Sequence, residues 1–269
     1  MGSNPTPSAK IQALTQLDYN PQRELTTTES PYRLWSFRQP GQWHGKPNVS
    51  DGLEDQRMSR KKIREFAAAL KIPFLVHFTR VVNLPSIMKH GLYPIGRVRE
   101  VGAEPEVNDQ LRLDGYLDGT SLSIAFPNNP MLFKYRKENE GTAWVVLALH
   151  PSILWTKDCA FCMHNAADGK ISSQDLASLK TVDALAGMFG EIEGMASRKE
   201  QKLKTYDPTD VQAEVLVFDM IESKYVVGAA FETKATKDEY SAVLGERKIV
   251  VHGTSKGFFG SRGYSRKYR

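Results

Sequence analysis

The spacing of hydrophobic residues predicts a chain of mixed helices and strands between about residue 60 and residue 252. Arg60–Ile72 repeats apolar side chains at helical spacing, with Ile63, Phe66 and Leu70 on one face. Leu84–Leu92 opens with a proline and ends beside a glycine, as short helices do. Thr142–His150 is apolar on both faces, which is typical of a buried strand.

The remaining predicted elements are less regular. They are strands at Phe74–Phe78, Val211–Ile221, Lys224–Glu232 and Lys248–His252, and helical segments at Ile171–Lys204 and Asp238–Arg247. We expect the strands at 211–221 and 224–232 to pair with each other. Because helices and strands do not alternate, we expect an α+β fold rather than a doubly wound parallel sheet. Residues 1–58 are polar and predict an irregular arm before a folded domain at 59–250.

The positive charge is concentrated at the end of the chain. The sequence has 36 Lys and Arg against 31 Asp and Glu, a formal net charge of +5. From Arg247 onward seven side chains are basic and none is acidic, so the other 246 residues carry 29 basic and 31 acidic groups. Residues 251–269 therefore predict a basic, aromatic tail, which its glycines keep from forming a stable helix. Such a tail either is loose or lies along a nucleic-acid strand.

Composition excludes several classes of protein. Two cysteines cannot build a disulfide framework, and no apolar run reaches the roughly 18 to 20 residues that cross a bilayer. The first residues lack the pattern of a signal peptide. We therefore expect a cytoplasmic monomer that does not contact a membrane. Neither a P-loop nor a GxGxxG motif is present, which argues against the common nucleotide-binding signatures.

Cys159, Cys162 and His164 form a CxxCxH motif, with His150 nearby. Such groups could hold zinc, but a structural zinc site has a second clear ligand pair at knuckle spacing. The sequence shows none, so we expect buried thiols and no metal.

A glutamate inside an apolar strand is the sharpest chemical feature. Glu214 lies in Gln-Ala-Glu-Val-Leu-Val, and strand alternation puts Gln212 on the same face. An isolated buried carboxylate costs several kcal/mol, so Glu214 either faces water or meets a cation or a ligand at a cleft. Upstream, His77 and Thr79 share a face of a short strand, where they can bind sugar hydroxyls or serve the core.

Three segments, in this order, resemble the DarT family of DNA ADP-ribosyltransferases. They are His77–Leu92, Ser121–Tyr135 and Gln212–Ile221, within roughly residues 73–232. The resemblance implies two mixed β-sheets packed at a large angle, with NAD as co-substrate in the cleft between them. It implies transfer of ADP-ribose from NAD to a base in single-stranded DNA, by a toxin that a cognate antitoxin neutralises by removing the modification, in some cases in defence against phage.

The resemblance also implies roles for individual residues. It assigns catalysis to Glu214 and Arg112, and NAD contacts to His77, Phe78, Thr79, Asn83, Met131 and Tyr135. Arg97 and Arg99 are weaker matches than Arg112. Gln212 corresponds to the position that selects the acceptor base. The strand Ser-Leu-Ser-Ile-Ala-Phe at 121–126 is closer to the guanine-directed subgroup than to thymine-directed members.

Basic side chains before the catalytic strand and in the tail are candidates for binding DNA phosphates. They are Arg198, Lys199, Lys202, Lys204, Arg262 and Arg266. The same lysines and arginines could instead form a solvated helix face. Rival hypotheses are a transferase that acts on RNA or protein, and a non-catalytic nucleic-acid-binding module.

Overall fold

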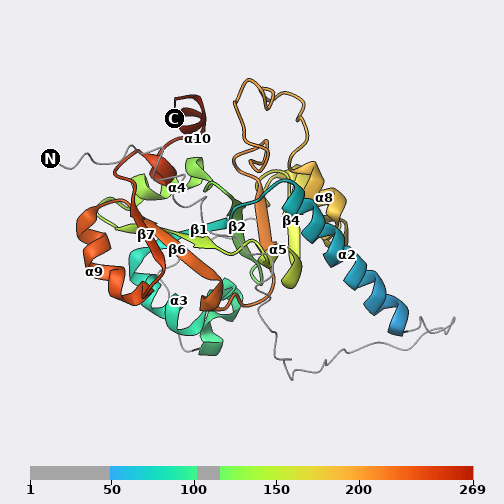
Figure 1. The fold of residues 1–269 in the computed structure, drawn as a ribbon, viewed down its shortest axis with the longest axis horizontal. Coiled ribbons are helices and arrows are strands. Elements are labelled where there is room, and N and C mark those ends of the chain that lie inside the picture. The colour runs from blue at the N-terminus through green and yellow to red at the C-terminus, as the bar shows by residue number, and fades with distance from the viewer. Residues whose placement is uncertain (1–48, 102–115, 269) are drawn as a thin grey trace.

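A computed structural model describes residues 49–101 and 116–268 of the chain (Figure 1). The strands are β1 (Leu75–Arg80), β2 (Thr120–Ile124), β3 (Trp144–Leu149), β4 (Cys159–Cys162), β5 (Glu214–Val217), β6 (Val226–Phe231) and β7 (Lys248–Val251). The α-helices are α2 (Val49–Ala69), α3 (Leu84–His90), α4 (Asn129–Glu138), α5 (Ile153–Thr156), α6 (Gly169–Ser172), α7 (Leu176–Leu179), α8 (Val182–Gly187), α9 (Lys234–Leu244) and α10 (Arg262–Lys267). Four 3-10 helices complete the set: η1 (Val81–Asn83), η2 (Ile95–Val101), η3 (Ser223–Tyr225) and η4 (Gly257–Phe259).

The described strands form one seven-stranded sheet in the order β4-β5-β2-β1-β3-β6-β7. All neighbours are antiparallel except β6 and β7. The β1–β2 seam is short, because only Leu75 and Val76 pair across it, with Ile124 and Ser123. Figure 1 shows β4 and β5 running in a different direction from β6 and β7. The expected α+β class is confirmed, but the described strands join in one sheet through this short seam and do not form the two separate packed sheets that the resemblance implies.

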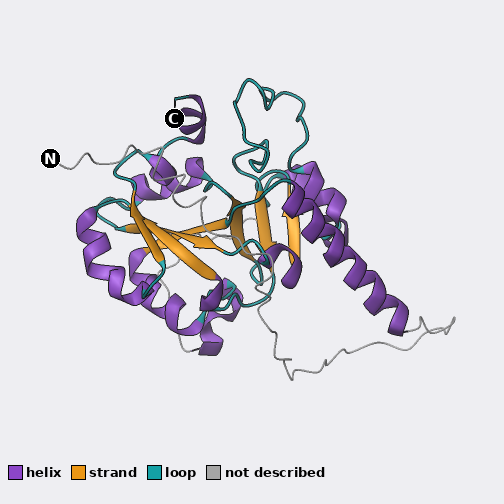
Figure 2. Cartoon of the chain, in the orientation of Figure 1, coloured by secondary structure: helices purple, strands orange, loops and turns teal. Residues whose placement is uncertain are grey.

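Helices pack on both faces of the sheet (Figure 2). The α2 face carries one large apolar cluster, which joins strand residues such as Leu75 and Val215 to α2, α3, α5, α8 and α9. The opposite, α4 face carries two separate clusters. One joins β1, β3 and β6 to α4 and η4, and the other joins β4 and β5 to α6 and α7. The apolar packing on the α4 face is therefore interrupted between these two clusters, along β2 and the start of β5.

Local sequence signals explain the elements that flank this interruption. Pro85 lies in the first turn of α3, and Gly91 caps its end with a φ of 97°. Asn128 caps α4 by accepting a hydrogen bond from the Met131 backbone N–H at 3.2 Å. β3 is buried along its whole length because it lies between β1 and β6.

Several predicted elements are wrong in extent or pairing. α2 begins at Val49, so residues 49–58 are helical rather than irregular. The segment 171–204 contains only the short helices α6, α7 and α8 before a long loop that runs to β5. β5 is four residues long and pairs with β2 and β4, not with the strand at 226–231. The strand does not begin at Val211 as predicted, because Asp210 Oδ1 accepts the Gln212 backbone N–H at 2.8 Å and so forms a turn there.

The tail also differs from its prediction, because it contains η4 and α10 instead of lacking helix. Ser261 caps α10 by accepting the Tyr264 backbone N–H, and Phe258 is fully buried. Among the described residues, no helix combines the length and hydropathy that a bilayer crossing requires.

Candidate active site

Glu214 occupies the interruption in the α4 face. It is the first residue of β5, opposite Cys162 on β4, and only 4% of its surface is exposed. Its Oε1 accepts the side-chain amide of Asn165 at 3.2 Å, and its Oε2 accepts the Ala166 backbone N–H at 3.0 Å. A buried carboxylate that accepts hydrogen bonds on both oxygens is held in one orientation. Glu214 is therefore a carboxyl group fixed in one orientation inside the sheet, not a half-exposed strand residue.

The segment after β4 also contacts a second carboxylate, that of Asp210. His164 Nδ1 lies 2.8 Å from Asp210 Oδ2, and both side chains are nearly buried. Asp210 in turn fixes the backbone of Gln212. Residues 164–166 thus contact both the catalytic candidate and the turn that leads to it. Sequence analysis missed Asn165 and Asp210, and its only signal for His164 was the CxxCxH motif.

Gln212 lies in the turn before β5, two residues before Glu214, and its side chain is exposed. Because the strand begins only at Glu214, strand alternation does not place the two side chains on one face as predicted. Gln212 instead lies at the surface, two residues before the buried carboxylate of Glu214. An exposed amide can donate to and accept from a ligand.

His77 bridges the seam where β1 and β2 separate. Its Nδ1 lies 3.0 Å from the Ser121 carbonyl of β2, beyond the last paired residues of the seam. Thr79 is 4% exposed, and its hydroxyl accepts the Asn83 side-chain amide at 2.9 Å. Continuing the β2–β5 register by one residue places Ser123 opposite Glu214, and Ser123 also pairs with Val76 of β1. One strand, β2, therefore separates β1 from the catalytic candidate.

Aromatic rings pack against each other on the α4 face of β1. The rings of Phe78 and Tyr135 are 6.3 Å apart, and Tyr135 lies parallel to the indole of Trp144 at 6.5 Å. Met131, one turn before Tyr135 on α4, is half-buried. The predicted NAD residues thus divide into two groups: Phe78 with Tyr135 on one side of β1, and His77, Thr79 and Asn83 on the other.

Two buried donors in this region have no acceptor among the described residues. They are the Asn128 side-chain amide at the start of α4 and the Trp144 indole N–H. Buried donors are normally paired. Together with the fixed carboxylate of Glu214 and the aromatic rings, they fit a ligand that is partly planar and rich in oxygen, such as a dinucleotide.

Of the three arginines considered for the catalytic role, Arg97 and Arg99 lie in the described part of the chain. Arg112 lies outside the described residues. Arg97 in η2 pairs with Glu100 through two hydrogen bonds, of which the shorter is 2.9 Å. Its hydrogen bond to Glu100 raises the pKa of Arg97. Arg99 is exposed.

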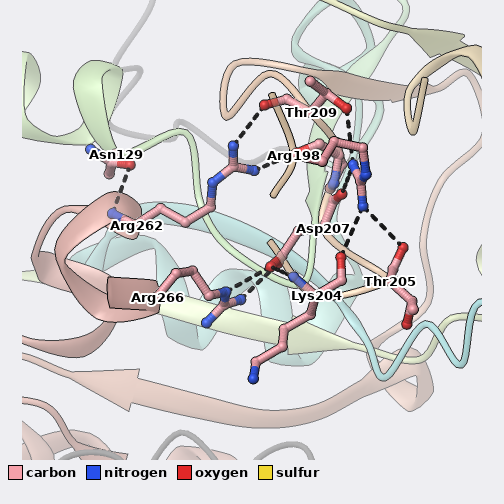
Figure 3. Close-up of polar contacts among 9 residues, drawn as sticks. Asn129, Arg198, Lys204, Thr205, Asp207, Thr209, Arg262 and Arg266 are labelled. Carbon is pink, nitrogen blue, oxygen red and sulfur yellow. Dashed lines mark hydrogen bonds and ion pairs between the residues drawn. The ribbon is translucent and has the colours of Figure 1, made fainter. Parts of the chain in front are cut away.

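All three arginines that were predicted to bind DNA phosphates form hydrogen bonds inside the protein (Figure 3). Arg262 is 4% exposed and donates to the Pro208 and Thr209 carbonyls. Arg266 forms a two-point ion pair with buried Asp207. Arg198 donates to the Asp207 carbonyl and the Thr209 hydroxyl. Lys199, Lys202 and Lys204 are exposed.

The CxxCxH residues do not converge. Cys159 packs on the α2 face and Cys162 on the α4 face, while His150 Nδ1 lies 2.7 Å from the Ser152 hydroxyl. Burial raises the pKa of the Cys159 thiol. Across residues 49–101 and 116–268, no three His, Cys, Asp or Glu side chains group as a metal site would require.

Comparison with known proteins identifies a matching family. A family model described as "ssDNA thymidine ADP-ribosyltransferase, DarT" matches residues 76–258. Among solved structures, the chain is similar to Thermosipho africanus DarTG in complex with ADP-ribose, with 16% identity, a TM-score of 0.46, and coverage of 69% of this chain and 50% of that one. The chain therefore spans about half the length of that relative.

Two further similar structures come from Thermus sp. 2.9. DarT in complex with carba-NAD+ shares 14% identity at a TM-score of 0.45, over 66% of this chain and 93% of that chain. DarT in complex with ADP-ribosylated ssDNA shares 14% identity at a TM-score of 0.47, over 66% and 92%. No curated protein sequence matches the chain.

Proposed function

The chain belongs to the DarT family of NAD-dependent ADP-ribosyltransferases that modify single-stranded DNA, and from this premise we propose that it joins ADP-ribose to a guanine base. The observation that carries the proposal is the buried carboxylate of Glu214, held by Asn165 and the Ala166 N–H, with the exposed amide of Gln212 two residues earlier. This arrangement supplies a fixed negative charge and an adjacent group that can recognise an acceptor.

Glu214 acts on the charge that develops during the reaction. NAD supplies the ADP-ribosyl group: its bond from ribose to nicotinamide breaks and nicotinamide leaves with the bonding electrons. A bond from ribose to a nitrogen of the base forms, and that nitrogen releases its proton to solvent. Positive charge builds on the ribose meanwhile, as in glycoside hydrolysis. Because the Glu214 carboxylate is already oriented, it stabilises that charge without reorganising.

Other residues bind and orient the co-substrate and the acceptor. We assign NAD contacts to two groups, Phe78, Met131 and Tyr135 on the aromatic side of β1 and His77, Thr79 and Asn83 on the other side. Asn128 and Trp144 join them, since each has a buried donor with no acceptor in the described part of the chain. Arg112 is proposed to assist the acceptor base.

Guanine is favoured because the Gln212 amide can both donate and accept on a base edge, and because residues 121–126 are closer to the guanine-directed subgroup. Thymine is the second candidate, and it is favoured by the match to a family described as ssDNA thymidine ADP-ribosyltransferases. A single-stranded substrate suits either base, since unpairing costs a few kcal/mol that an unpaired strand does not incur.

Oligonucleotides that each carry a single candidate base distinguish guanine from thymine as the acceptor. Poly-dA strands that carry one guanine, one thymine or one cytosine are incubated with NAD and weighed by mass spectrometry. We expect one added ADP-ribose on the guanine strand alone. Addition on the thymine strand alone would assign thymine and reject the guanine proposal. No addition on any strand, by protein shown to bind NAD, would reject transfer to a DNA base.

In the cell, we propose that the protein is a monomeric cytoplasmic toxin whose DNA adduct is removed by a partner antitoxin, in a toxin–antitoxin or phage-defence system. Induced expression in bacteria should arrest growth, and co-expression of an ADP-ribose-removing enzyme should restore it. Growth arrest that persists in Glu214→Gln would contradict this role, because that variant retains the fold without the carboxylate.

A further inference from the structure

Three arginines meet at the turn just before the catalytic strand, and two of them come from the last helix of the chain (Figure 3). We define residues 204–210 as the Asp207 turn. We propose that α10 is a positioning element for the acceptor side of the active site, with Arg266 and Arg262 as positioning residues that clamp the Asp207 turn. The inference rests on the proposed function, because it concerns how Gln212 is held.

Arg266 binds the turn through its carboxylate. Its Nε donates to Asp207 Oδ2 and its Nη2 to Asp207 Oδ1, both at 2.7 Å. The side chains are 6% and 0% exposed. Asp207 Oδ2 also accepts the Lys204 backbone N–H at 2.8 Å. A planar two-point pair fixes orientation as well as distance, and a buried one cannot exchange its partner for water.

Arg262 binds the same turn through its backbone. Its Nη1 and Nη2 donate to the carbonyls of Pro208 and Thr209 at 2.7 and 2.9 Å. Its own backbone N–H donates to Asn129 Oδ1 of α4 at 3.3 Å. Burial lowers the pKa of Arg262 to about 10. A buried guanidinium is costly unless it is hydrogen-bonded. Because its partners here are two carbonyls of the turn, a shift of the turn would leave this charge unpaired.

Arg198 closes the clamp from the other side. Its Nη1 donates to the Asp207 carbonyl at 2.7 Å and to Thr209 Oγ1 at 2.9 Å, and its Nη2 donates to the Lys204 carbonyl at 2.9 Å. Thr209 is also anchored to the end of α8, since its backbone N–H donates to the Met188 carbonyl. The carbonyls of residues 204, 207, 208 and 209 therefore all accept from guanidinium groups, so the turn cannot shift without breaking several bonds.

The clamp leads directly into the acceptor site. Asp210 follows Thr209, accepts the Gln212 backbone N–H and contacts His164. Glu214 has its own supports in Asn165 and Ala166, on a different segment. Loosening the clamp should therefore disturb Gln212 more than Glu214. This separates a positioning role from general stabilisation, which would affect all parts of the site through the folded fraction alone.

The test compares Arg266→Gln with Lys267→Gln, a neighbouring exposed residue of α10, at temperatures where both are folded. For Arg266→Gln we expect the KM for a guanine oligonucleotide to rise about tenfold, the scale of one charge-assisted hydrogen bond, with the KM for NAD within about twofold. Lys267→Gln should change neither. A fall in apparent kcat with both KM values unchanged would overturn the inference, because a structural role lowers only the active fraction.

Hydrogen–deuterium exchange tests the clamp independently of activity. In Arg266→Gln, amides at 207–213 should exchange at least about tenfold faster, while β3 amides remain unchanged. Unchanged exchange at 207–213 would overturn the inference. If wild-type protein modifies no oligonucleotide, the proposed function fails and the exchange result alone decides the clamp. If Arg266→Gln does not fold, Arg266→Lys, which keeps the charge but loses the two-point geometry, gives the same readouts.

Discussion

At the scale of single residues, the site depends on donors aimed at Glu214. The carboxylate accepts from Asn165 and from the Ala166 N–H, and both donors belong to the short segment after β4. Neighbouring His164 holds Asp210, which fixes the Gln212 backbone. Preorganised groups of this kind stabilise charge at no cost of rearrangement during reaction. We therefore propose that the segment at 164–166 contributes to the chemistry by orienting the Glu214 carboxylate.

Removing the Asn165 amide should weaken catalysis without unfolding the protein. In Asn165→Ala, Glu214 Oε1 loses a charge-assisted hydrogen bond, and we expect kcat for transfer to fall about tenfold. Gln174→Ala removes an exposed amide that donates only to the Lys170 carbonyl, and it serves as the control. The prediction is checked by the steady-state rates of both variants, provided that their melting temperatures are the same. Transfer by Asn165→Ala within about twofold of wild type would mean that the amide does not orient the carboxylate.

At the scale of elements, sequence predicted best what local patterns determine. α3 was expected from Pro85 and Gly91, and β3 from its unbroken apolar run. The Asp207 turn and α10 could not be predicted in this way, because Arg262 and Arg266 of α10 bind groups of the turn that lie more than 50 residues away in the chain. Glycines in the tail argued against helix, yet Ser261 caps α10 and burial of Phe258 anchors the segment.

The same reasoning applies to the candidate site. Glu214 stands out in the sequence as a carboxylate in an apolar strand, whereas the strand spacing applied to Gln212 fails because β5 begins only at Glu214. Asn165 and Asp210 carried no pattern, because their roles arise only when β4 pairs with β5. The basic side chains were visible, but whether an arginine faces water or binds an internal carbonyl depends on long-range packing.

Two glycines of the C-terminal segment test how tightly it packs. Both have a positive φ, 55° at Gly257 and 71° at Gly253. A Cβ on Gly257 would lie 2.5 Å from the His252 ring, whereas one on Gly253 meets nothing closer than 4.0 Å. Gly257→Ala should therefore lower the free energy of unfolding by about 1–3 kcal/mol more than Gly253→Ala. Equal losses in denaturant melts would show that η4 is not packed as described.

At the scale of the whole molecule, part of the positive charge from Arg247 onward is used inside the folded domain. Arg247, Arg262 and Arg266 all donate to carbonyls or to a carboxylate of the folded domain. An electrostatic interaction with DNA must therefore use other groups. Three predicted phosphate contacts remain at the surface: Lys199 and Lys202 in the loop before the Asp207 turn, and Lys204 at its start.

The salt dependence of DNA binding measures their contribution. For single-stranded DNA, each phosphate contact contributes about 0.7 to the slope of log K against log salt. The double variant Lys199→Gln, Lys202→Gln should thus reduce the slope by about 1.4 in fluorescence anisotropy titrations. Lys62→Gln, which removes one exposed lysine of α2, should leave the slope unchanged. An unchanged slope in the double variant would place the phosphate contacts elsewhere.

The central claim is that the Glu214 carboxylate promotes transfer of ADP-ribose from NAD to a base of single-stranded DNA. The most direct measurement is the mass of a guanine-containing oligonucleotide after incubation with NAD and either wild-type protein or Glu214→Gln. We predict one added ADP-ribose with wild type, and a rate at least about 100-fold lower with Glu214→Gln, whose amide keeps the shape but not the charge. Equal rates with the two folded proteins would contradict the account.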